Sequence, residues 1–256
     1  MNWADPDREP AGVAAVLSKR WELVAALADG PRSKAALESD LGVARSTVYK
    51  GLRELEGVGV VRPTNDGYAL TQFGRLARRK HDDYRASLHR LCTVRSVLEA
   101  IPRETHLPLS LLERSTVVLP ARHAPERPLT TFEAMAETAD SLRSLSPVAI
   151  PRFMPDIHDA VTAGTRDIEL VIESDALAVL RAEYEPFDEA LVDGLQVHES
   201  PDPLPFGLTL FDDEAVSLSS YGGDGSLRGL LLCDCPHAGD WAATVYERYR
   251  ADAIEV

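Results

Sequence analysis

The residues between Leu41 and Leu55 place cationic, hydroxyl and aromatic groups on one side of a predicted helix. The other side is apolar, because Val48, Leu52 and Leu55 recur at positions i, i+4 and i+7. The outward residues are Arg45, Ser46, Tyr49, Lys50 and Arg53. Guanidinium, ammonium and hydroxyl groups bind phosphates and the polar edges of bases. A short helix of this kind after a Gly-containing turn is typical of the second helix of a helix-turn-helix, and an ordinary amphipathic surface helix is the alternative.

A second group of reactive side chains is Cys233-Asp234-Cys235-Pro236-His237. Two thiolates and an imidazole would supply three of the four ligands of a tetrahedral zinc site. No fourth ligand follows nearby, and cysteines at the end of a strand more often pack inside a sheet. We therefore predict no metal and no cofactor, and keep Cys233, Cys235 and His237 as the residues of an alternative metal- or redox-sensing function.

Catalytic motifs are missing from the sequence. It holds no GxSxG, no HExxH and no Gly-rich loop followed by a lysine. Lys80 is the last lysine, so the second half cannot carry the His-x-Lys pair of a phospholipase D-like active site. Gly222-Gly223-Asp224-Gly225 lies between two predicted strands and indicates a hairpin turn rather than a phosphate-binding loop. We do not expect an enzyme.

Charge is distributed unevenly along the chain. Overall, 27 Lys and Arg face 41 Asp and Glu, which gives a net charge of −14. Residues 1–100 hold 16 basic and 13 acidic side chains, whereas residues 101–256 hold 11 and 28. The mildly basic first part predicts a module that touches phosphate, joined to a very acidic second part. The acid excess, with only four lysines against 23 arginines, resembles proteins of salt-accumulating archaea, although a coding bias towards arginine alone would explain the few lysines.

Nothing in the sequence predicts a secreted or membrane protein. No run of 18 apolar residues occurs, and the N-terminal residues 1–10 are acidic and polar. Three cysteines give no disulfide framework. We expect a cytoplasmic protein.

Residues 13–71 predict three helices and then a β-hairpin, which is the order of a winged helix. A first helix spans Val13 to Asp29; Ser33 can cap the second through its hydroxyl, whereas Ala44 offers the third no capping hydroxyl. The hairpin turn is Thr64-Asn65-Asp66-Gly67, whose residues tolerate positive φ. Arg62 lies at the base of this wing and Asn65 at its tip.

The segments SKAALESDLGVARSTVYKGLRELEGVGVV and RPTNDGYALT resemble the winged-helix domain of bacterial and archaeal transcription regulators. The resemblance implies that the second helix of the motif enters the major groove of DNA while the wing follows the phosphate backbone. The residues that would then face base edges or phosphates are Arg45, Ser46, Thr47, Tyr49 and Lys50. Arg53 and Arg62 would meet the backbone, with Asn65 at the tip of the wing.

One long helix is predicted from Gln72, capped by Thr71, to about Ala100. Its heptad-like apolar positions are Tyr84, Leu88, Leu91 and Leu98. We predict that this stripe forms a homodimer and so presents two recognition helices to two half-sites. The alternative is that the helix packs on its own C-terminal domain.

Beyond residue 102, strands and helices alternate, which predicts an α/β domain with a mixed sheet. The predicted strands comprise residues 116–119, 147–150, 168–172 and an antiparallel meander from 195 to 233. A capping box of Thr130 and Glu133 opens a helix that runs to about Leu145. Ser174 is expected to cap the helix after the 168–172 strand.

The order of segments from STVVLP to DWAATVYERYR, and above all LPFGLTLFDDEAV, resembles the effector domain of archaeal winged-helix regulators named after a methanogenesis regulatory protein. The resemblance implies an architecture and no particular ligand. Ligands of α/β sheets bind at the carboxyl ends of strands. The candidate effector residues at such ends are Arg152, Glu173, Ser174, Arg122 and His123. Arg152 would hold an anionic ligand, or it pairs with a surface carboxylate.

We therefore expect an α+β or α/β chain in three parts. These are a DNA-binding winged helix-turn-helix in residues 1–71, a linker or dimerisation helix in residues 72–101, and an α/β effector-sensing domain in residues 102–256. Together they predict an archaeal regulator that binds operator DNA as a homodimer and responds to a small effector. The alternative is an interaction module whose winged helix binds a protein of the transcription machinery, against which the basic recognition face argues.

Overall fold

The computed structural model describes residues 9–256, which divide after His89 into two compact units. Residues 1–8, which belong to the first predicted part, lie outside the described residues. The division falls within a helix rather than in a loop, so each unit is described by itself. No helix in residues 9–256 has the length and apolar character needed to cross a lipid bilayer.

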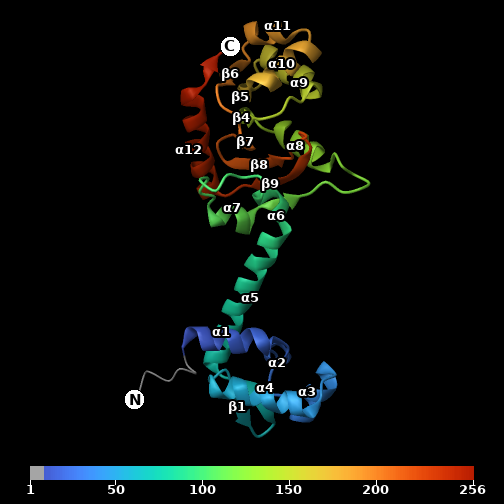
Figure 1. Ribbon diagram of the computed structural model, residues 1–256, viewed down its shortest axis with the longest axis vertical. Helices are drawn as coiled ribbons and strands as arrows, with labels where there is room; N and C mark the ends of the chain where they lie inside the picture. The colour runs from blue at the N-terminus through green and yellow to red at the C-terminus, as the bar shows by residue number, and fades with distance from the viewer. Residues whose placement is uncertain (1–8) are drawn as a thin grey trace. The chain divides into compact units, whose positions relative to one another are not determined.

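The first unit has the predicted winged-helix order. It contains α1 (Pro10–Lys19), α2 (Trp21–Ala26), α3 (Lys34–Leu41), α4 (Arg45–Gly57), β1 (Val61–Thr64) and β2 (Gly67–Leu70) (Figure 1). The prediction of one helix from Val13 to Asp29 is wrong in detail, because the helix is interrupted at Arg20. The predicted cap is confirmed: the Ala36 backbone N–H donates to Ser33 Oγ over 3.1 Å. Ala44 makes no side-chain cap, also as predicted.

The turn between α3 and α4 depends on Gly42, whose φ of 62° lies in the left-handed region that favours glycine. From there α4 buries its apolar stripe, and Val48, Leu52 and Leu55 are each at most 1% exposed. Burying three such side chains contributes about 1.5–3 kcal/mol each before conformational entropy is counted. This stripe fixes the rotation of α4 and turns its polar face to solvent.

The wing is a β-hairpin with a two-residue turn, and the backbone at Arg32 pairs with its second strand. Thr64 pairs with Gly67, and the Arg32 backbone exchanges two 2.9 Å hydrogen bonds with Tyr68. The positive φ predicted for the turn falls on Gly67 alone, at 125°. A Cβ at Gly67 would lie 2.1 Å from the Arg32 carbonyl oxygen, so this position needs glycine for space as well as for backbone conformation.

The helix after the wing is shorter than predicted. α5 (Gln72–Thr93) begins as expected directly after Thr71, whose Oγ1 accepts from the Gly74 N–H over 2.9 Å. It ends at Thr93 rather than Ala100, because Val94 leaves the helical conformation before α6 (Arg95–Leu98) resumes. Val94 and Val97 are fully buried in the core of the C-terminal unit.

The C-terminal unit is an α/β domain around an eight-stranded mixed sheet, which confirms the predicted fold class. Its strands, in the order in which they pair, are β10 (Ile254–Glu255), β6 (Gln196–Ser200), β5 (Asp167–Glu173), β4 (Ser141–Ser146), β7 (Gly207–Phe211), β8 (Ala215–Tyr221), β9 (Leu227–Cys233) and β3 (Thr116–Val118). β4, β5 and β6 run parallel, and the remaining pairs are antiparallel.

Helices cover both faces of this sheet (Figure 1). On one face lie α6, α7 (Leu109–Arg114) and α12 (Pro236–Asp252), which pack on Leu145, Leu208, Val216 and their neighbours. On the other lie α8 (Arg127–Ala136), the 3-10 turn η2 (Pro151–Phe153), α9 (Met154–Thr162), α10 (Ser174–Glu183) and α11 (Phe187–Val192). The buried residues therefore form two hydrophobic cores, one on each face of the sheet.

Two predicted elements of this domain are wrong. The helix expected from Thr130 to Leu145 is α8, which starts earlier and ends at Ala136, so Thr130 is not its cap. The strand expected at residues 147–150 is instead Ser141–Ser146. Pro147 is the first residue of the predicted stretch and Pro151 directly follows it, and proline cannot donate to the two ladders of a central strand. Ser174 begins α10 but its hydroxyl bonds to Glu199 rather than capping the helix.

Candidate functional site

The solvent face of α4 carries the residues predicted to contact DNA. Arg45, Ser46, Thr47, Tyr49, Lys50 and Arg53 are all exposed, whereas the opposite stripe is buried. Within residues 9–256, Lys50 and Arg53 form no ion pair, and Arg45 reaches Glu38 only at 3.9 Å. Cations without close carboxylates are available for phosphate, because no strong internal pair must first be broken.

A cation–aromatic cluster links this face to the wing. The Arg45 guanidinium donates to Tyr49 Oη over 3.1 Å, which lowers the pKa of the Tyr49 phenol. Lys34 Nζ lies 3.9 Å from the centroid of the Tyr49 ring and 5.3 Å from that of Tyr68 in β2. Lys34 was missed from the sequence, although it is one of only four lysines and directly follows the Ser33 cap. It adds a cation between α4 and the wing.

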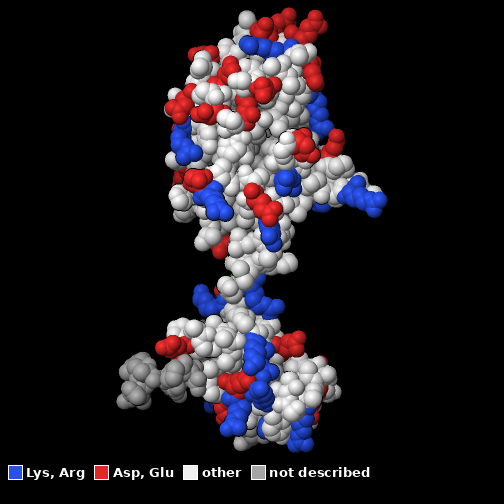
Figure 2. All heavy atoms as spheres, in the orientation of Figure 1, with Lys and Arg blue, Asp and Glu red and all other residues white. Residues whose placement is uncertain are grey.

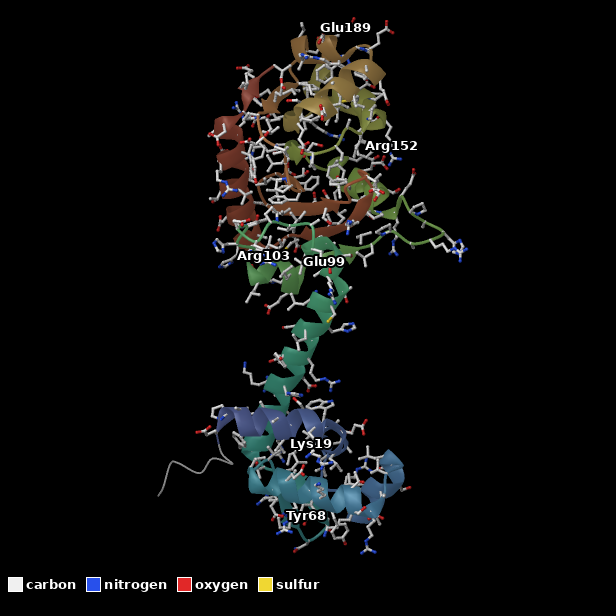
Figure 3. All side chains as sticks on the ribbon, viewed as in Figure 1. Lys19, Tyr68, Glu99, Arg103, Arg152 and Glu189 are labelled. Atoms are coloured by element: carbon white, nitrogen blue, oxygen red, sulfur yellow. The ribbon has the colours of Figure 1, made fainter. Side chains whose placement is uncertain are left out.

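An ion-pair network around Glu54 holds the C-terminal half of α4, called here the base of the helix. Glu54 accepts from Arg20 Nε over 2.7 Å and from Lys19 Nζ over 3.2 Å (Lys19 is labelled in Figure 3). The hydrogen bond from Arg20 is the largest cause that lowers the pKa of Glu54 to about 2. The network ties α4 to α1 and to the start of α2, and so orients the exposed face.

Both wing residues predicted to contact DNA are exposed. Arg62 lies on β1 and Asn65 in the turn. The wing is attached to the rest of the unit through Arg32, whose side chain pairs with Asp40 over 3.0 Å. Figure 2 shows Lys and Arg along the visible face of this unit and many Asp and Glu over the visible face of the C-terminal domain.

The four residues predicted to form a dimer do not share one environment. Tyr84 is 58% and Leu88 41% exposed on α5. They border a hollow of the first unit beside Trp21, whose ring centroid lies 4.8 Å from that of His81 with the two planes tilted by 40°. Leu91 and Leu98 are instead half-buried against the core of the C-terminal unit. Of the four residues, Tyr84 and Leu88 are therefore accessible for dimer contacts, whereas Leu91 and Leu98 pack within their own domain.

The five candidate effector residues are dispersed, and none lines the apolar cavity between the sheet and α8, η2 and α9. Arg152, labelled in Figure 3, pairs with Glu126, the residue before α8, and with Glu133 within α8, each over 3.2 Å. Glu173 accepts from the Leu204 N–H over 2.6 Å, and Ser174 bonds to Glu199. Arg122 and His123 lie exposed in the loop before α8. Arg152 is thus the paired surface arginine of the alternative interpretation.

The cysteine cluster lacks the features of a metal or redox site. Cys233 and Cys235 are 3% and 2% exposed in the core beneath α12. Burial raises the pKa of the Cys233 thiol to about 11, whereas reactive and metal-binding cysteines are thiolates. In the described part of the chain, no group of three or more His, Cys, Asp or Glu is placed to hold a metal ion.

Two family descriptions match the chain. Residues 125–252 match the family described as methanogenesis regulatory protein FilR1, middle domain. Residues 9–93 match the family described as HVO_A0261 N-terminal domain. No curated protein matches the sequence significantly.

Solved structures offer weaker likenesses. TrmBL2, described as an archaeal chromatin protein, is 16% identical, with 97% of this chain and 100% of that chain covered at a TM-score of 0.44. Nuc, a phospholipase D family member from Salmonella typhimurium, is 13% identical, with 56% and 97% covered at a TM-score of 0.42. At such scores, neither likeness supports a conclusion about function.

Proposed function

Because the chain belongs to the family of the methanogenesis regulatory protein FilR1 middle domain, we propose that it is a homodimeric, sequence-specific regulator whose affinity for operator DNA is set by a small effector. In general terms, the protein is a DNA-binding transcription regulator. We expect it to act in the cytoplasm. The observation that carries the proposal is the exposed face of α4, with Arg45, Lys50 and Arg53 outside strong ion pairs in the described chain.

Sequence-specific binding would use α4 in the major groove. Arginine donates two hydrogen bonds to the O6 and N7 of guanine, and hydroxyl groups bond to several base edges. Arg45, Ser46 and Thr47 occupy the N-terminal turn of α4, the part of a recognition helix that reaches base edges first. Lys50 and Arg53 lie further along the same face and would neutralise phosphates.

The wing would contact the backbone beside the groove. Arg62 supplies a cation and Asn65 an amide at the hairpin tip, and neither is buried. Such contacts fix the register of the protein on the duplex without reading bases. Lys34, held between Tyr49 and Tyr68, adds a third cation between helix and wing.

Dimerisation would use Tyr84 and Leu88, because both are large apolar side chains left exposed on α5. A two-fold dimer would place two α4 helices on half-sites of a palindromic operator. An effector bound to the C-terminal domain would then shift the population between dimers that fit and do not fit the half-site spacing. Within residues 9–256, the buried pair Cys233 and Cys235 does not favour the metal- or redox-sensing alternative, and the basic face of α4 argues against the protein-interaction module.

The test is fluorescence anisotropy of the full chain with DNA from its own promoter, at several KCl concentrations. Arg45→Ala should weaken specific binding about tenfold or more, since a bidentate base contact is worth about 1–3 kcal/mol. Arg103→Ala, an exposed arginine of the C-terminal unit, is the matched control and should bind as the wild type does (Figure 3). If both variants bind equally well, α4 is not the recognition helix.

A further inference from the structure

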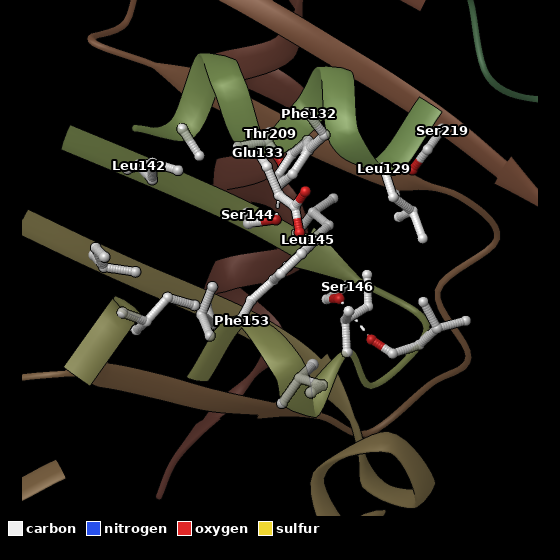
Figure 4. Close-up of a pocket in the computed structure, with 18 of the residues that line it drawn as sticks. Leu129, Phe132, Glu133, Leu142, Ser144, Leu145, Ser146, Phe153, Thr209 and Ser219 are labelled. Atoms are coloured by element: carbon white, nitrogen blue, oxygen red, sulfur yellow. Dashed lines mark hydrogen bonds between the residues drawn. The ribbon is translucent and has the colours of Figure 1, made fainter. Parts of the chain in front are cut away.

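One face of the C-terminal sheet carries a cavity of about 170 Å³. Its floor is formed by β4, β5, β7, β8 and β9, and its roof by α8, η2 and α9 (Figure 4). Phe132 of α8 and Phe153 of η2 close it with rings stacked 6.0 Å apart. An apolar cavity of about 150 Å³ is already large enough to bind benzene, so this one can take an aromatic ring or a short branched chain.

The cavity exists because β7 and β8 carry different residues on their two faces. Towards α12 they place large aliphatic side chains, namely Leu208, Leu210, Val216 and Leu218. Towards α8 and α9 they place Gly207, Thr209, Ser217 and Ser219, which pair across the two strands. Small residues on the second face leave space that the helices above do not fill.

Hydroxyl groups form a polar stripe along this floor. Ser144 Oγ and Thr209 Oγ1 lie 2.8 Å apart, and Ser219 Oγ donates to Tyr221 Oη over 3.2 Å. Burial raises the pKa of Tyr221, so its phenol stays neutral and keeps a proton to donate. A Cβ at Gly207 would meet Ser219 Oγ at 2.2 Å, so the glycine is what lets this hydroxyl lie beside the cavity.

Charge around the cavity does not suit an anion. Of its lining side chains, all within the described chain, Arg166 is the one cation, and its guanidinium donates to the Glu137 carbonyl oxygen over 2.7 Å. Glu133, Glu137 and Asp156 are acids of the lining. Arg152 approaches Glu133 from outside and neutralises it, and thereby ties η2 to α8 over the cavity.

We infer that this cavity binds the effector, and that the effector is a small, uncharged and mainly apolar molecule with one hydroxyl or carbonyl group. The inference rests on the proposed function, since it names the ligand class of the proposed effector-sensing domain. The apolar part contacts Phe132, Phe153 and the aliphatic walls. The polar group exchanges hydrogen bonds with the Ser144–Thr209 pair or with Tyr221. The acids of the lining offer a cation no buried partner, because Glu137 and Asp156 are exposed and Glu133 is already paired with Arg152. A charged group of either sign would therefore be desolvated inside the cavity at a cost.

The first test is isothermal titration calorimetry of the full chain with four probes that share one ring: toluene, benzyl alcohol, benzoate and benzylamine. Toluene and benzyl alcohol should bind saturably, with a Kd of about 1 mM or tighter and a negative heat-capacity change that marks apolar burial. Benzoate and benzylamine should bind at least about tenfold more weakly. The inference is overturned if neither neutral probe binds, or if benzoate binds as tightly as benzyl alcohol.

The second test changes the floor of the cavity. Thr209→Leu should fill it and weaken toluene binding at least about tenfold, whereas Thr244→Leu, the same change on an exposed position of α12, should not. Thr209→Val keeps the volume and removes the hydroxyl, so it should weaken benzyl alcohol about fivefold and leave toluene unchanged. Wild-type toluene affinity in a folded Thr209→Leu would refute the site. Neither assay contains DNA, so their failure is distinct from a failure of the promoter-binding experiment.

Discussion

The ion pairs that hold the base of α4 make a prediction about stability and pH. Glu54 contacts Arg20 and Lys19, and its pKa is lowered from 4.5 to about 2. Fully converted, that difference corresponds to about 3.4 kcal/mol at 1.36 kcal/mol per pKa unit. The carboxylate is 25% exposed, however, and solvent screening reduces such pairs strongly. We therefore expect Glu54→Gln to destabilise the winged helix by about 1 kcal/mol at neutral pH.

The sign of the pH dependence follows from the lowered pKa. A carboxylate whose pKa falls on folding stabilises the protein fully above its unfolded value, here near 4.5, and the stabilisation is lost as the pH falls towards 2. The difference between wild type and Glu54→Gln should thus be constant from pH 7 to about pH 5 and should vanish near pH 2. It should also shrink in concentrated KCl, where charges are screened.

Hydrogen exchange measured by mass spectrometry reports on the two units separately, so it can assign the loss of stability to the first unit. Amides in residues 45–57 should exchange about fivefold faster in Glu54→Gln at pH 7, while peptides from residues 141–233 provide an internal reference. Glu56→Gln, an exposed acid without an ion pair in the described chain, is the matched control. Equal exchange in the two variants would refute the claim that this network stabilises α4. Thermal unfolding between pH 2 and pH 7 then checks the predicted loss.

Three further outcomes are expected. Lys50→Gln should reduce the slope of log K against log salt for promoter binding by about 1, as loss of one phosphate contact does, and an unchanged slope would remove Lys50 from the interface. Gly74→Ala should destabilise the winged helix by about 2 kcal/mol, because the added Cβ would lie 2.0 Å from the Val60 carbonyl oxygen. Urea unfolding followed at the wing, residues 61–70, measures this loss. A urea midpoint equal to that of the wild type would contradict the prediction. In thiol labelling at pH 8, exposed Cys92 should react quickly and buried Cys233 and Cys235 slowly, so that two or three fast thiols would contradict the buried, protonated state of the pair.

The winged helix could be predicted because its signals are local. Ser33 marks the start of α3, Gly42 its end, and the spacing of Val48, Leu52 and Leu55 specifies which side of α4 is buried. Each signal acts within about one helical turn and needs no knowledge of distant residues. The exposure of Arg45 and Lys50 then follows from helical geometry alone.

β4 could not be predicted because its strand conformation comes from its neighbours. Leu142 and Leu145 are three residues apart, which suits a helix as well as a strand. The segment is extended because it pairs with β5 on one side and β7 on the other. The prediction that Tyr84, Leu88, Leu91 and Leu98 form one dimer stripe depends on tertiary contacts in the same way. Leu91 and Leu98 have the heptad spacing of a dimer interface, but both pack against the C-terminal core.

The cavity was missed although the sequence carries a trace of it. In GLTLF and AVSLSSY, small or hydroxyl residues alternate with large aliphatic ones, whereas the candidate effector residues were charged or polar residues after strands. That alternation becomes a cavity only when the register sets Gly207 opposite Ser219 and Thr209 opposite Ser144. The first pairing joins two strands of one hairpin, whereas the second joins segments 65 residues apart in the chain, whose register local patterns do not specify.

The two unlike faces of β7 and β8 have a consequence for how this domain can diversify. The leucines and valines towards α12 form the main core of the domain, so substitutions there destabilise the fold. Ser144, Thr209 and Ser219 line space rather than fill it, so exchanging them for one another, or replacing the bonded pair Ser144 and Thr209 together by small apolar residues, alters the shape and polarity offered to a ligand without opening the main core. A duplicated copy of such a gene can therefore acquire a new signal through a few substitutions on one side of a sheet whose other side stays unchanged.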